Sequence, residues 1–99
     1  MTINKVMQHK KIIISLDGRL DTITAPKLQD ELTASFEKSS EITLDFTNLS
    51  YISSAGLRTL LAGHKTAVAK NATMTLTGVS EDILEVINMT GFSEFLTIE

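Results

Sequence analysis

The stretch ITLDFTNLSYISSAGLRTLL, residues 42–61, joins two apolar patterns of different period. Its first part, Ile42 to Phe46, alternates apolar and polar residues and contains β-branched side chains, which is typical of a strand. After the adjacent serines Ser53 and Ser54, leucines recur at helical spacing. The sequence therefore predicts a strand, a connecting turn over TNLSYI and a helix that begins at the two hydroxyls.

The same two patterns continue on either side of this stretch. Alternating or β-branched runs predict four further strands, at Ile3–Gln8, Lys11–Asp17, Thr73–Gly78 and Glu94–Glu99. Amphipathic spacing predicts three helices, over Thr24–Lys38, from Ser54 to about Lys70, and between Ser80 and Gly91. We expect Thr24 and Ser80 to cap their helices, and His64, Val68 and Val86 to lie on buried stripes.

This order of elements determines the expected fold class. The polar segment between the first two strands predicts a hairpin, so those strands should be antiparallel. Helices between the later strands predict right-handed crossovers and parallel pairing. We therefore expect an α/β fold of order β-β-α-β-α-β-α-β, with about four parallel strands, an antiparallel first strand and three amphipathic helices.

Length and composition exclude several classes of protein. The chain has 99 residues, of which 42% are hydrophobic, and it should form one domain over residues 1–99. Its net charge of -3 is spread without a basic block, which argues against a nucleic-acid partner. There is no cysteine for a disulfide or a thiolate. The N-terminus lacks a signal-peptide pattern and no apolar run could span a bilayer, so we expect a cytoplasmic protein without a membrane partner.

The adjacent serines allow two interpretations. In one, Ser53 caps the helix, Ser54 fills its first turn, and Gly56 packs against a strand. In the other, the hydroxyl of Ser54 is functional, because the start of a helix at the carboxyl end of a strand favours an anion such as a phosphate. Ala55 and Gly56 would then allow close approach of a partner, and Arg58, one turn further on, could pair with the phosphate or with an acidic partner group.

Two motifs resemble those of one known family. LDFTNLSYISSAGLRTLL is similar to the core motif of STAS domains, the anti-sigma factor antagonists, and GRLD, residues 18–21, is similar to a second signature of that family. The resemblance covers essentially the whole chain. It implies that the unphosphorylated protein binds an anti-sigma factor, a GHKL-type serine kinase, and so releases a sigma factor. Phosphorylation of a serine would weaken that complex, and a PP2C-type phosphatase would reverse it.

The resemblance assigns the phosphorylated serine to Ser54, with Ser53 as the second candidate. The family often has aspartate at the position of Ser53 and a hydroxyl at the position of Ala55, so this chain departs from the pattern at both. The predicted partner-binding residues are Asp21, Asp45, Ser53, Ser54, Ala55, Gly56 and Arg58. An alternative is a STAS-type scaffold or sensor subunit in another regulatory or lipid-transport complex.

Catalysis is not expected. Asp21 and Asp45 could converge near the turn as acid and base, but no nucleophile or metal-ligand set accompanies them, so we expect them to order the loop or to contact a partner. His64 lies ten residues beyond Ser54, about 15 Å along a helix, and is out of reach as a base for a serine hydrolase. His9 and His64 form no zinc pattern, and no glycine-rich nucleotide motif is present. We expect no cofactor and no metal.

Overall fold

The computed structural model describes residues 1–99. Its elements are β1 (Thr2–Gln8), β2 (Lys11–Leu20), α1 (Ala25–Lys38), β3 (Glu41–Ile52), α2 (Ser54–Ala69), β4 (Thr73–Thr77), α3 (Glu81–Thr90), the 3-10 turn η1 (Phe92–Glu94) and β5 (Thr97–Ile98). They form one five-stranded sheet of order β1-β2-β3-β4-β5, in which β1 is antiparallel to β2 and the other pairs are parallel. The predicted fold class and element order are confirmed.

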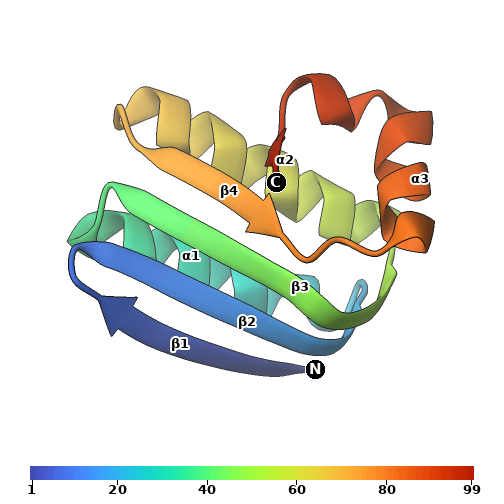
Figure 1. Cartoon of the computed structure of the whole chain (residues 1–99), viewed down its shortest axis with the longest axis horizontal. Helices are drawn as coiled ribbons and strands as arrows, with labels where there is room; N and C mark the ends of the chain where they lie inside the picture. Colours follow the sequence, from blue (N-terminus) through green and yellow to red (C-terminus); the bar gives the residue numbers. More distant parts are fainter.

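The sheet has one covered face and one open face. Figure 1 shows α1 and α2 behind the sheet, with α3 beyond the carboxyl end of β4. Alternate residues of the central strands are buried against these helices, among them Ile12, Ile14, Leu16, Ile42, Leu44, Phe46 and Leu76. The intervening residues, such as Ser15, Thr43 and Asp45, are half-buried and point to the open face. This alternation explains why the strands could be recognised from their period of two.

Strands β2 and β3 are longer than predicted. The segment expected to be a connecting turn, TNLSYI, continues β3 and pairs with the end of β2, where Leu20 lies opposite Ile52. Two register shifts interrupt this pairing, and Gly18 adopts a φ of +113°. In β3 the buried residues then follow at intervals of three, Phe46, Leu49 and Ile52. A strand with that spacing does not fit a period of two, which is why the prediction was wrong here.

Three smaller expectations were also wrong. The last strand is only Thr97–Ile98, because the chain first forms η1. Val68 is 67% exposed, since the buried stripe of α2 passes through Leu60 and Ala67. Val86 is 37% exposed, because the short helix α3 buries only Ile83 and Ile87. Ser80 does cap α3, as predicted, by accepting a hydrogen bond from the N–H of Ile83.

Candidate functional site

The two adjacent serines have different structural roles. Ser53 is the N-cap of α2, and its Oγ accepts a hydrogen bond from the N–H of Gly56 at 3.2 Å. Its own N–H donates to the carbonyl of Leu20 at 2.9 Å, which ties the start of α2 to the end of β2. Ser54 is the first residue of the helix, and its side chain is exposed and makes no hydrogen bond within the chain. Ser53 is therefore fixed in place, whereas the Ser54 hydroxyl is free to react.

Gly56 allows the start of α2 to pack closely against the two long strands. A Cβ at this position would lie 2.8 Å from Cγ of Leu20 and 2.9 Å from Cγ1 of Ile52. The glycine is buried, so it does not offer the open backbone surface that one interpretation of the sequence expected. Its role in the structure is to set the position of Ser53 and Ser54 relative to β2 and β3.

Asp21 organises the turn between β2 and α1. One carboxylate oxygen accepts hydrogen bonds from the N–H groups of Ile23 and Thr24, at 3.0 and 3.1 Å. The hydroxyl of Thr24 accepts from the N–H of Asp21 at 2.8 Å and donates to the carbonyl of Arg19 at 2.8 Å. The bond from the Thr24 N–H is the main reason that the pKa of Asp21 is below its usual value.

One sequence prediction needs correction at this turn. The predicted cap of α1, Thr24, makes no side-chain capping bond to its helix, and the Asp21 carboxylate instead accepts from the N–H of Thr24 in the turn before the helix. Leu20 lies opposite Ile52, so Asp21 is close to the start of α2. The structure thus places Asp21 close to the serines, as a residue that shapes the loop, which is one of the two roles expected for it.

Asp45 lies elsewhere on the surface. It accepts hydrogen bonds from the hydroxyl and the N–H of Thr47, at 2.6 and 3.0 Å, and from the Ser15 hydroxyl at 3.5 Å. The Thr47 hydroxyl is the main cause of the lowered pKa of Asp45. It lies seven positions before Ile52 in β3, about 23 Å along the strand. The expected convergence of Asp21 and Asp45 was therefore wrong, because β3 continues past Phe46.

The surface around Ser54 contains residues that the sequence analysis missed. The guanidinium of Arg19 lies 4.0 Å from the centre of the Tyr51 ring, across the extended pairing of β2 and β3. Ile23, in the turn that Asp21 organises, is 83% exposed. Tyr51 was assigned to a connecting turn, and nothing in the sequence distinguished an exposed isoleucine from a buried one. Exposed arginine, tyrosine and isoleucine side chains are suited to contact a protein partner.

A shallow hollow of 390 Å³ adjoins this surface between the starts of α1 and α2. Its walls are formed by Thr22, Ala25, Pro26, Gln29, Ala55, Arg58 and Thr59. Arg58 is exposed one helical turn from Ser54, as predicted. Ala55, the residue after Ser54, is half-buried and lines the hollow with its small side chain.

No catalytic base or metal cluster accompanies Ser54. His64 is further along α2, half-buried, with its ring 6.5 Å from that of Phe95. No group of three or more histidine, aspartate or glutamate side chains is placed to hold a metal ion. None of the helices combines the length and the hydropathy needed to cross a membrane. The arrangement is an exposed hydroxyl on a surface with apolar and basic side chains.

Both the fold and this helix start agree with the sequence resemblance. The STAS domain family model matches residues 2–99, and the chain belongs to this family. It is 27% identical over 89 residues to the anti-sigma-B factor antagonist of Listeria monocytogenes, covering 89% of this chain and 78% of the relative. It is 25% identical over 100 residues to the anti-sigma-B factor antagonist of Bacillus subtilis, covering 99% of this chain and 92% of the relative.

Solved structures share the fold at lower sequence identity. The anti-sigma factor antagonist SpoIIAA in its unphosphorylated form superimposes with a TM-score of 0.79 at 18% identity, over 99% of this chain and 87% of that one. The phosphorylated form of SpoIIAA, described as a Bacillus cell fate determinant, gives a TM-score of 0.77 at 17% identity, over 99% and 91% of the two chains. These similarities establish the fold of the chain.

Proposed function

We propose that this protein is an anti-sigma factor antagonist that is switched by phosphorylation of Ser54. The observation that carries the proposal is the exposed hydroxyl of Ser54 at the start of α2, which makes no hydrogen bond within the chain. Tyr51, near the end of the preceding strand, and Ile23, in the turn after β2, are also exposed. The names of the relatives support the antagonist function, and the existence of SpoIIAA in both phosphorylation states supports a switch in this fold.

The start of α2 is suited to carry a phosphate. The first N–H groups of a helix have no intrahelical acceptor, and here Ser53 Oγ occupies only the N–H of Gly56. A phosphate on Ser54 would lie at the positive end of the helix dipole, with Arg58 four residues further on. Ser53 is a neutral cap where the family often has aspartate, so the cap adds no negative charge beside the phosphate.

The same phosphate would oppose binding of a partner. In the unphosphorylated state, Tyr51, Ile23 and the Ser54 hydroxyl would be covered by the anti-sigma factor, a GHKL-type serine kinase. Phosphorylation adds about -1.5 to -2 charges in the middle of that contact. The complex could persist only if the charged phosphate were desolvated, which costs free energy. The complex would weaken, and a PP2C-type phosphatase would restore it. Asp45, on another part of the surface, stays a predicted contact for which the geometry gives no added support.

Phosphorylation with a cognate kinase and ATP tests the proposal directly. Mass spectrometry should locate one phosphate on Ser54, and Ser54→Ala should remain unmodified while Ser53→Ala is still modified. Ser54→Glu should weaken the complex with the anti-sigma factor in a calorimetric titration. Equal modification of the Ser54→Ala variant, or wild-type affinity of the Ser54→Glu variant, would contradict the switch. Hydrolysis of simple esters that Ser54→Ala abolishes would point instead to an enzyme.

A further inference from the structure

The last third of the chain differs in charge from the rest. All nine lysines and arginines lie within residues 5–70. Residues 71–99 contain five carboxylates and no basic side chain: Glu81, Asp82, Glu85, Glu94 and Glu99. Three of these belong to α3, so all the charged side chains of this helix are acidic. No basic side chain of α3 itself offsets these carboxylates, although the net charge of the whole chain is only -3.

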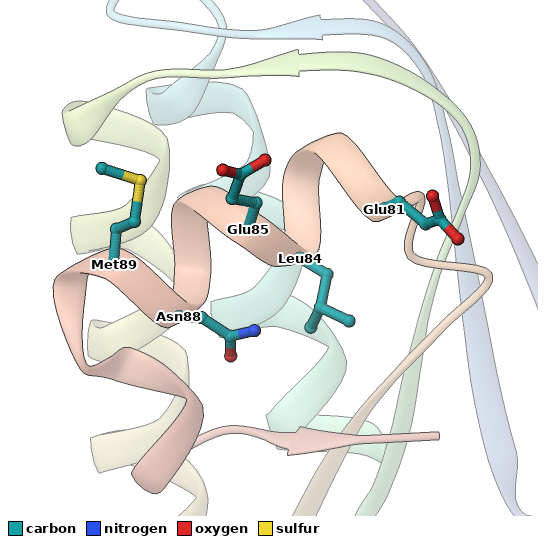
Figure 2. Close-up of a pocket in the computed structure, with 5 residues that line it drawn as sticks. All are labelled: Glu81, Leu84, Glu85, Asn88 and Met89. Carbon is teal, nitrogen blue, oxygen red and sulfur yellow. The ribbon is translucent and has the colours of Figure 1, made fainter.

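The outer side of α3 also carries a groove. Two neighbouring ridges run along the surface of α3. One ridge carries Glu81, Glu85 and Met89, spaced four residues apart, and the other carries Leu84 and Asn88. Figure 2 shows Glu85 and Met89 on one side of the ribbon and Leu84 and Asn88 on the other. These five residues line a shallow hollow of 360 Å³ that runs along the helix.

The groove combines apolar and acidic side chains, with Leu84 between the two glutamates along the helix and Met89 near its C-terminal end. Met89 is 80% exposed, whereas Leu84 is half-buried, so both supply apolar contact area without belonging to the core. Glu81 and Glu85 make no salt bridge or hydrogen bond through their carboxylates within the chain. An exposed methionine next to unpaired carboxylates fits a partner that brings apolar and basic side chains together.

From this surface we infer that α3 docks a basic amphipathic helix of another protein, separately from the Ser54 surface. A helix is the partner that fits, because the ridge of one helix packs into the groove between two ridges of another. Its apolar ridge would contact Leu84 and Met89, and lysines or arginines beside that ridge would pair with Glu81 and Glu85. The inference goes beyond the antagonist function and does not depend on it.

The probe is a synthetic helical peptide of roughly 18 residues made of alanine, leucine and lysine, with a leucine ridge flanked by lysines. It is titrated into the isotopically labelled full chain, and amide chemical shifts report the site. We expect saturable shifts concentrated on residues 81–89. A matched peptide with glutamate in place of lysine should cause none.

Two variants and one control make the test specific. Glu85→Lys should lower the affinity for the lysine peptide by about fivefold or more, because one ion pair becomes a repulsion. Met89→Ser should lower it through loss of apolar contact. Glu94→Lys makes the same change of charge outside the groove and should have a smaller effect. Thermal melts of each variant check that the chain remains folded.

Three outcomes would overturn the inference. Shifts spread over all acidic residues, or equal effects of Glu85→Lys and Glu94→Lys, would mean only long-range attraction. No binding of the lysine peptide would also reject the site. A wild-type dimer in analytical ultracentrifugation that Glu85→Lys dissociates would show that a second copy of this chain, and no basic helix of another protein, occupies the groove.

Discussion

Replacement of Gly56 by alanine tests whether the start of α2 is held by close packing. The added Cβ would lie 2.8 Å from Leu20 Cγ, 2.9 Å from Ile52 Cγ1 and 3.0 Å from the carbonyl oxygen of Leu20. Leu20 is fully buried, and its carbonyl accepts the hydrogen bond from the Ser53 N–H. The backbone of β2 therefore cannot move away without loss of that bond.

Two opposing terms set the size of the effect. Alanine in place of a helical glycine stabilises the folded state by up to about 1 kcal/mol. Overpacking at a site that cannot relax costs about 1–3 kcal/mol. We expect Gly56→Ala to lower the free energy of unfolding by about 1–2 kcal/mol, because the contacts include a strand backbone as well as branched side chains.

Gly63 in the same helix is the matched control. A Cβ there would lie 2.9 Å from Sδ of Met74 and 3.1 Å from Cδ1 of Leu32, so it meets the ends of side chains. Methionine is flexible enough to move, and Gly63→Ala should leave stability unchanged or raise it by up to about 1 kcal/mol. Urea denaturation followed by circular dichroism measures both variants. Equal stability of Gly56→Ala and wild type would refute the packing argument.

Three further predictions address the caps, the carboxylates and the partner surface. Ser53→Ala should cost about 1 kcal/mol in urea denaturation through loss of the cap, and Ser54→Ala less than about 0.5 kcal/mol; a reversed order would contradict the assigned roles. The lowered pKa of Asp45 means that its carboxylate stabilises the fold above the unfolded-state pKa and that this contribution is lost as pH falls through the folded-state value. Asp45→Asn should therefore flatten the pH dependence of stability on the acid side, and an unchanged profile would refute this. Tyr51→Ala should weaken the anti-sigma factor complex by about 2 kcal/mol in calorimetry, and wild-type affinity would remove Tyr51 from the interface.

The element order could be predicted because most strands and helices keep a regular period. β2 from Ile12 to Leu16 and α1 from Leu28 to Phe36 bury residues at the spacings of a strand and a helix. The end of β3 could not be predicted, since Phe46, Leu49 and Ile52 follow at intervals of three. Register shifts that arise from pairing with another strand leave no local pattern in the sequence.

The candidate site was predictable to the extent that it is local in sequence. Ser53, Ser54 and Arg58 belong to one helix start, so their relative positions follow from helical geometry. The contact of Arg19 with Tyr51 joins two strands, and it depends on a register that the sequence did not reveal. The same unknown register led to the wrong expectation that Asp45 approaches the serines.

The length of β3 changes the electrostatic account of the proposed switch. Had the strand ended at Phe46, Asp21 and Asp45 would both flank Ser54 and would make a phosphate there unfavourable in the free protein. With β3 extended to Ile52, only Asp21 remains nearby, and its carboxylate is engaged by the N–H groups of Ile23 and Thr24. A phosphate on Ser54 would then be tolerated in the isolated chain. The phosphate would carry a free-energy cost only when a partner covers the surface. It would therefore weaken the complex and leave the free protein unaffected, as a switch of binding requires.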